Sequence, residues 1–204
     1  MRHLKNSAAV ALFILGLAAN AAGASPLATV QGPVEAVLAT LMDARYANAT
    51  PELREEQHKK IRDIIQALFD DEEISARAVG QHWKKFKPEQ KKAFTEAFSD
   101  LLSNTYIRRA QSDYKNEKVV FTAEEMVTNT KAVVHTKIIR EGGETLVDYS
   151  LKTAEAGWRI YDINIEGVSL IQNYRSQFSQ ILLKESPDQL IERVRKKNAE
   201  GGKQ

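Results

Sequence analysis

Few side chains of this 204-residue chain have a type and spacing that could do catalytic or metal chemistry. The histidines are His3, His58, His82 and His135, and no two stand four residues apart, the spacing at which one helix face presents two imidazoles to a metal ion. The absence of cysteine excludes a thiol nucleophile, an iron–sulfur cluster, a cysteine-based zinc site and disulfides. We therefore expect no metal, no cofactor and no catalytic residue.

Other reactive patterns are incomplete. Residues 166–170 (EGVSL) lie where a nucleophile elbow would, but they lack the second glycine of G-x-S-x-G, so we expect Ser169 to begin a helix. The four acids of residues 70–73 could pair as carboxylates, yet acids at a helix start are commonly solvated partners of the helix dipole. His135 is predicted to be a hydrogen-bonded residue of a strand.

The elements that must position these groups change period along the chain. Apolar residues recur at helical spacing in both terminal parts and alternate in the middle. Helices are predicted from Pro33, after the Thr50 cap, from Asp70 to Gly80, from Pro88 to about Tyr114, after Gly167, and after a capping box at 186–189. Strands are predicted at 118–122, 131–140, 144–152 and 158–166. The fold class is α+β, with a twisted antiparallel sheet of about four strands between N- and C-terminal helices.

The predicted sheet has apolar groups on both faces. Alternation places Val147, Tyr149, Leu151 and Ile163 on one face and Leu146 and Ile160 on the other. Either helices cover both faces, or one face encloses a cavity. The pattern leaves both alternatives open.

Residues 1–24 are predicted to be a cleaved signal peptide. A basic start precedes the apolar run of residues 8–19, and small residues favour cleavage after Ala24, with Ala21 as the other candidate. Twelve residues span only about 18 Å, too short for a membrane anchor. Residues 25–195 then form one domain, and residues 196–204 form a polar tail that we expect to fray. The periplasm is the expected compartment.

The charge balance argues against nucleic acid as a partner. The sequence has 29 Lys and Arg and 27 Asp and Glu, and loss of Arg2 and Lys5 with the leader leaves 27 of each. A neutral domain has no general attraction for phosphate backbones.

Three segments carry a family resemblance. Residues 158–178 (WRIYDINIEGVSLIQNYRSQF) run from a strand through E-G-V-S-L into a helix with N-Y-R-x-Q-F. Residues 80–84 (GQHWK) with 88–90 (PEQ), and residues 98–106 (FSDLLSNTY), supply the other two. The chain resembles the MlaC-type, or toluene-tolerance, family over roughly residues 33–194, although Lys87 replaces the usual polar cap before the proline.

The resemblance implies a soluble periplasmic phospholipid carrier without catalytic residues. It implies an apolar cavity for the acyl chains of a glycerophospholipid. Its expected partners are an inner-membrane ABC transporter with an MCE-domain ring and an outer-membrane lipoprotein complex. The alternatives are an envelope protein for another apolar lipid, hopanoid or sterol-like, or an enzyme with His135, Asp162 or Tyr161 inside a cone-shaped cavity.

The candidate residues follow from this reading. Asp162 and Arg175 are predicted to form a structural ion pair, or Arg175 to contact the headgroup. A hinge is predicted at Gly167 or at Gly80. The predicted lipid-lining residues are Phe98, Leu101, Leu102, Tyr106, Val147, Tyr149, Leu151, Ile163, Ile165, Val168, Ile171, Tyr174 and Phe178.

Overall fold

The computed structural model describes residues 23–201, so the apolar run of the predicted leader and residues 202–204 lie outside the described residues. The helices are α1 (Pro26–Met42), α2 (Pro51–Gln66), α3 (Asp71–Val79), α4 (Pro88–Asp113), α5 (Leu170–Leu182) and α6 (Pro187–Gly201), with short 3-10 turns η1 (Ala44–Tyr46) and η2 (Gly80–Lys85). The strands are β1 (Lys118–Thr128), β2 (Lys131–Arg140), β3 (Gly143–Ala154), β4 (Gly157–Ile165) and β5 (Val168–Ser169). The predicted α+β class is confirmed.

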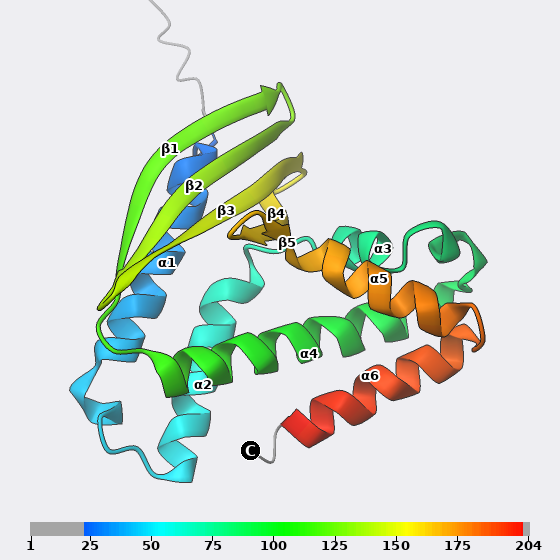
Figure 1. Ribbon diagram of the computed structural model, residues 1–204, viewed down its shortest axis with the longest axis horizontal. Coiled ribbons are helices and arrows are strands. Elements are labelled where there is room, and N and C mark those ends of the chain that lie inside the picture. Colours follow the sequence, from blue (N-terminus) through cyan, green and yellow to red (C-terminus); the bar gives the residue numbers. More distant parts are fainter. Residues whose placement is uncertain (1–22, 202–204) are drawn as a thin grey trace, which may run out of the picture.

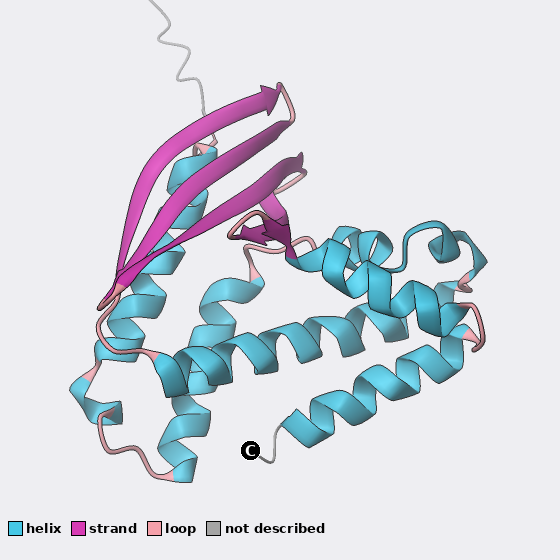
Figure 2. Ribbon diagram, viewed as in Figure 1, coloured by secondary structure: helices cyan, strands magenta, loops and turns pink. Residues whose placement is uncertain are grey.

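The strands form one antiparallel sheet in the order β1-β2-β3-β4-β5. Figures 1 and 2 show the curved sheet at the top, with α1 packed against it, α4 running beneath it, and α6 beside α4 on the side away from the sheet. The tight turns before β3 and β4 use Gly142 and Gly157 at φ of 88° and 99°, a backbone conformation that suits glycine.

Several predicted boundaries are wrong, each for a local reason. Helix α1 begins at Pro26, because Ser25 accepts a hydrogen bond from Ala28 N as its N-cap, and the helix continues through Pro33. The second half of β1 is exposed at the sheet edge, so its sequence shows no apolar alternation. Helix α6 continues to Gly201, so the polar tail that was expected to fray from residue 196 is helical as far as residue 201.

A bulge in β4 decides which side chains face inward. Ser150 pairs with Asp162 and Leu151 with Ile160, which leaves Tyr161 as an extra residue. Ile160 therefore lies on the same face as Leu151, and it is only 1% exposed. Its expected position on the opposite face is wrong, because alternation alone cannot reveal an inserted residue. On that opposite face, Leu146 is 45% exposed.

Apolar side chains are buried in two separate clusters. One lies among the helices and contains Phe94, Phe98, Tyr174 and Phe178, whose rings pack at centroid distances of 5.0 to 5.6 Å. The other lies between the sheet and α1. It consists of Val30, Leu68, Val134, Leu151 and Ile160.

Charged groups join α3 to the sheet. The Lys152 ammonium lies 3.0 Å from Asp70 and 2.9 Å from Glu73, and Glu73 also accepts a 2.7 Å hydrogen bond from Arg77. Burial alone would raise the pKa of Glu73, but the hydrogen bonds from Lys152 and Arg77 outweigh it and lower that pKa. Asp70 also caps α3 through Glu73 N. Asp70 and Glu73 are therefore ion-paired structural groups. The sequence predicted acids that interact only with solvent and with the helix dipole.

Replacing Phe98 tests the helical cluster. Its side chain is fully buried against three aromatic rings, so Phe98→Ala should lower the free energy of unfolding by about 3–5 kcal/mol. Urea titration followed by circular dichroism measures this change. Lys92→Ala, on an exposed turn of the same helix, should stay within about 0.5 kcal/mol of the parent. A loss for Phe98→Ala no larger than that of the control would contradict the assignment.

Candidate functional site

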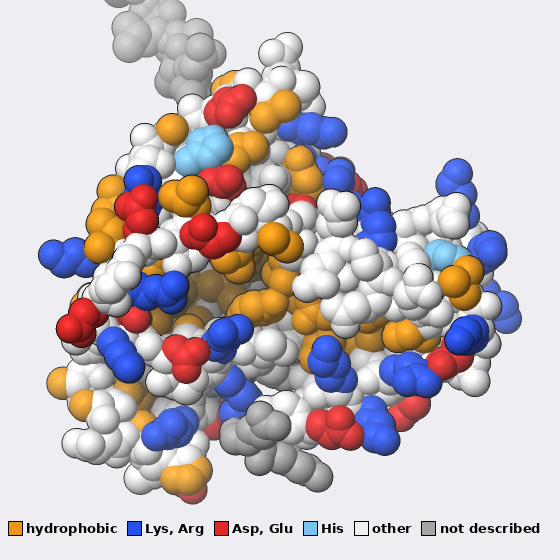
Figure 3. Space-filling view, in the orientation of Figure 1, with side chains coloured by type: hydrophobic (Ala, Val, Ile, Leu, Met, Phe, Trp, Pro, Cys, Tyr) orange, Lys and Arg blue, Asp and Glu red, His pale blue; other side chains and the backbone are white. Residues whose placement is uncertain are grey.

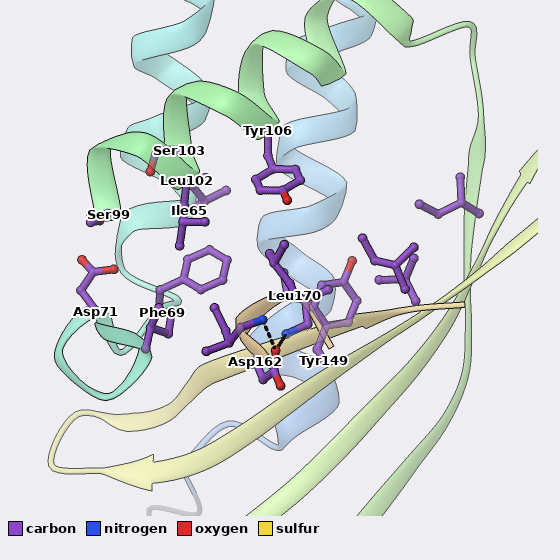
Figure 4. A pocket seen from close by; sticks show the side chains of 16 residues that line it. Ile65, Phe69, Asp71, Ser99, Leu102, Ser103, Tyr106, Tyr149, Asp162 and Leu170 are labelled. Carbon is purple, nitrogen blue, oxygen red and sulfur yellow. Dashed lines mark hydrogen bonds between the residues drawn. The ribbon is translucent and has the colours of Figure 1, made fainter. Parts of the chain in front are cut away.

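An apolar pocket of about 350 Å³ lies between the inner face of the sheet and the helices beneath it. Figure 3 shows a hollow with hydrophobic side chains at this position, and Figure 4 shows the pocket from close by. Its walls come from α2, α3, α4, α5, the α2–α3 link and strands β2 to β4. The lining residues are Ile65, Phe69, Asp71, Ile74, Ser99, Leu102, Ser103, Tyr106, Ile138, Val147, Tyr149, Asp162, Ile163, Ile165, Leu170 and Ile171.

Strand register and helical period explain why these side chains meet. Val147 pairs with Ile165 and Tyr149 pairs with Ile163, so the apolar groups of β3 and β4 stand side by side on one face. On α4, residues 99, 102, 103 and 106 are spaced i, i+3, i+4 and i+7, which is one stripe of a helix. The sheet and α4 thus supply two facing walls.

Seven of the thirteen predicted lining residues lie in this pocket. All seven are on the inner sheet face, on the pocket stripe of α4 or at the start of α5. They are Leu102, Tyr106, Val147, Tyr149, Ile163, Ile165 and Ile171. That they bind lipid remains a prediction.

The other six lie elsewhere. Leu151 belongs to the cluster under α1, and Val168 is 61% exposed at the sheet edge. Four belong to the helical cluster, because α4 and α5 contribute apolar side chains both to the cluster and to the pocket. These four are Phe98, Leu101, Tyr174 and Phe178.

Sequence reasoning missed the contribution of the N-terminal half. Ile65 lies in the helix predicted after the Thr50 cap but was not among the predicted lining residues, and Phe69 carried no signal because it lies in a link between helices. Backbone hydrogen bonds hold that link on β4, from Asp70 N to Ile160 O at 2.9 Å and from Ile160 N to Leu68 O at 2.8 Å. This pairing turns Phe69 into the pocket.

A second apolar pocket of about 230 Å³ adjoins the first. It lies between α1 and the sheet, where Val30, Val34 and Leu38 of α1 line it. The two pockets share Ile65, Phe69 and Tyr149. The side chains of these three residues therefore stand between the two pockets.

Burial favours the neutral forms of three titratable groups that line the first pocket. Burial raises the pKa of the Asp71 carboxyl, although a hydrogen bond with Ser99 acts in the opposite direction. Burial also raises the pKa values of the Tyr106 and Tyr149 phenols. The two phenols therefore stay neutral near neutral pH.

The residues of the enzyme alternative do not meet in the pocket. His135 Nδ1 lies 2.8 Å from Asp148 Oδ1, on the outer face of the sheet. The Tyr161 ring packs under the Arg77 guanidinium at 4.1 Å. Of the three residues named for that alternative, only Asp162 lines the pocket. The described residues contain no group of three His, Asp or Glu side chains placed to hold a metal ion.

The predicted ion pair between Asp162 and Arg175 is wrong. Asp162 accepts hydrogen bonds from Ile163 N at 2.8 Å, Ile171 N at 3.2 Å and the Ser169 hydroxyl at 2.6 Å, which fix the start of α5 on β4. Backbone N–H groups at a helix start satisfy a carboxylate without a cation. Ser169 is the N-cap of α5, as predicted, and accepts a hydrogen bond from Gln172 N at 3.0 Å.

Arg175 instead joins α5 to α3. Its Nε donates a 2.6 Å hydrogen bond to the Arg77 carbonyl, and it crosses Gly80, where a Cβ would come within 3.4 Å of that nitrogen. Gly80 also has a φ of 57°. Two segments that carry the resemblance, residues 80–84 and 158–178, are therefore in contact here.

Comparisons with known proteins agree with this architecture. A family model described as "MlaC protein" matches residues 33–196. The chain is 24% identical over 139 residues to the intermembrane phospholipid transport system binding protein MlaC of Haemophilus influenzae; this match covers 66% of the chain and 64% of the relative.

A solved structure is also similar. It is the phospholipid-binding protein from Ralstonia solanacearum in complex with a phospholipid, 27% identical, with a TM-score of 0.74. The similarity covers 87% of this chain and 99% of that one. Since the family model spans most of the sequence, the chain belongs to the MlaC protein family.

Proposed function

We propose that this protein binds a phospholipid in the apolar pocket and carries it between the membranes of the cell envelope. The observation that carries the proposal is the pocket, whose sheet wall is mostly apolar and whose α4 wall adds Leu102 and Tyr106 beside two small serines. The similar structure from Ralstonia solanacearum is described as a complex with a phospholipid, which supports the choice of ligand. The relative from Haemophilus influenzae is described as part of an intermembrane transport system, which supports the transport role.

The two adjoining pockets suit two acyl chains. We assign one chain to the larger pocket and the second to the pocket under α1, with Phe69 and Tyr149 between them. The larger pocket, at about 350 Å³, lies near the lower end of the range for ligand sites, roughly 300–1,000 Å³, and the smaller one, at about 230 Å³, lies below it. Both rings can turn about their side-chain bonds, so the partition adapts to chain length.

The headgroup belongs where the larger pocket reaches the surface. Ile165 lines the pocket and is 38% exposed, and its partner Val168 is more exposed still. A polar headgroup placed there keeps its hydration, whereas burial without hydrogen bonds would cost several kcal/mol, roughly 2–7 for one polar group. Arg175, whose Nε is bonded to Arg77, is not assigned to the headgroup.

The energetics of chain burial determine how the lipid must leave. Each buried CH₂ contributes about 0.8 kcal/mol, so two chains of roughly 16 carbons give a gross term on the order of 25 kcal/mol. Release into water is therefore extremely slow. We infer that unloading occurs while the protein is docked, so that the chains pass along a continuous apolar path. The hinge expected at Gly167, which has a φ of 81°, remains a prediction for this step.

The docking partners are proposed from the family. They are an inner-membrane ABC transporter with an MCE-domain ring and an outer-membrane lipoprotein complex. The periplasm is the matching compartment, reached through the signal peptide proposed at residues 1–24. In the part of the chain that the structure describes, no helix has the length and apolar character needed to cross a membrane.

Mass spectrometry of an organic extract tests the ligand. Protein purified from a Gram-negative host without detergent should release diacyl phospholipid close to one molecule per chain. A single sterol-like or hopanoid species would support the other apolar lipid instead. Protein that remains empty after incubation with phospholipid vesicles would overturn the proposal.

Filling the pocket should displace the lipid. Ser103 faces the pocket from α4, so Ser103→Phe places a ring where an acyl chain would lie. We expect the variant to retain its circular dichroism spectrum and to lose most of the co-purified phospholipid. Ser176→Phe adds the same ring to an exposed position of α5 and should retain the lipid. Equal lipid content in the two variants would refute the assigned binding site.

A further inference from the structure

Helix α4 has a second face that the proposed function does not use. Its pocket stripe is made of residues 99, 102, 103 and 106. Residues 101, 104, 105, 108 and 112 project about half a helical turn away, because each residue advances about 100° around the axis. This second face borders a groove of about 480 Å³ between α4, α6 and α2, the three helices that meet in the lower part of Figure 1.

The groove is lined by cations and by neutral polar groups. Four positive charges from three helices converge on it. Among its described lining residues there is no carboxylate. The residues are Arg54 of α2; Leu101, Asn104, Thr105, Arg108, Arg109, Gln111 and Ser112 of α4; and Lys197, Asn198 and Gly201 of α6.

Nearby acids neutralise only part of this charge. Glu55 lies 3.3 Å from Arg108 and Asp113 lies 3.4 Å from Arg109, and both acids are well exposed, so these pairs are weak. Arg54 donates a long 3.4 Å hydrogen bond to the Ala49 carbonyl. The Lys197 ammonium lies 5.8 Å from the centroid of the Tyr174 ring, within reach of a cation–π contact.

The walls of the groove are held in place by amide side chains. Asn104 of α4 donates a 2.7 Å hydrogen bond to Asn198 of α6. Gln111 donates 2.9 Å hydrogen bonds to the Arg54 carbonyl and to Gln57 of α2. The cations are therefore presented by a fixed frame, which lowers the cost of binding an anion.

One donor of the groove has no acceptor. The Arg108 Nε is buried and makes no hydrogen bond to any residue that the structure describes. A buried donor without a partner is rare in proteins and calls for an explanation. The planar guanidinium is suited to bind phosphate oxygens through two parallel hydrogen bonds.

We propose that this groove binds a phosphate-bearing anion at a site separate from the apolar pocket. A compact group with several negative oxygens contacts cations from three helices at once, whereas a single carboxylate reaches fewer of them. Low-dielectric walls also focus the positive potential into the groove. The phosphate belongs either to a soluble phosphate ester or to the headgroup of an anionic lipid at a membrane surface.

Paired charge-neutralising variants test the site. Arg54→Gln with Lys197→Gln removes two groove cations, while Lys59→Gln with Lys196→Gln removes the same charge from exposed positions of the same two helices. Calorimetric titration with inorganic pyrophosphate at low ionic strength measures the soluble source. Flotation with phosphatidylglycerol vesicles, compared with phosphatidylcholine vesicles, measures the membrane source.

We expect the groove variant to bind its probe at least tenfold more weakly than the control variant, because it lacks two of the four cations that line the groove. Pyrophosphate binding with this difference assigns the site to a soluble ester, and vesicle binding with this difference assigns it to a lipid headgroup. Equal loss in both variants, or no binding of either probe by the parent protein, overturns the proposal. Lipid loading of the apolar pocket should be equal in both variants.

Discussion

The structure depends on the burial of its apolar side chains in two clusters instead of one. The aromatic cluster of α4 and α5 packs on one side, the sheet packs against α1 on the other, and Phe69 contacts both. The aromatic cluster is closely packed, whereas the cluster under α1 also borders the smaller pocket. Neither fills the space between α4 and the inner face of β3 and β4. The pocket is therefore a consequence of how the two cores are separated.

Polar contacts keep the two cores in register without occupying the pocket. Lys152 holds α3 to the sheet through Asp70 and Glu73, Asp162 holds the start of α5 on β4, and Arg175 ties α5 back to the Arg77 carbonyl. The first two contacts join the sheet to α3 and α5, and the third joins these two helices to each other. Among the residues that the structure describes, no hydrogen bond or ion pair joins α4 to β2, on the opposite side of the pocket.

Helix α4 connects three separate environments. Phe94 and Phe98 pack in the helical cluster, and Ser99, Ser103 and Tyr106 face the pocket. Arg108 and Arg109 line the groove between α4, α6 and α2. A helix that is 26 residues long with so even a distribution of apolar residues shows no single amphipathic face. This explains why its periodicity predicted a buried helix correctly but could not assign individual residues to the core or to the pocket.

The sequence by itself determined the elements, the antiparallel order and the family, because caps, periods and tight-turn glycines are local signals. Alternation within an unbroken stretch also placed Val147, Tyr149 and Ile163 on one face, and the family resemblance implied that an apolar cavity would be present. Only the tertiary structure decided the position of Ile160, because that position depends on a bulge. It also decided that Phe69 lines the pocket, because this depends on pairing between the α2–α3 link and β4. The partners of Asp162 and Arg175 depend on how α5 leaves the sheet. These features arise where segments distant in sequence meet, and packing between such segments is not encoded in the period of either one.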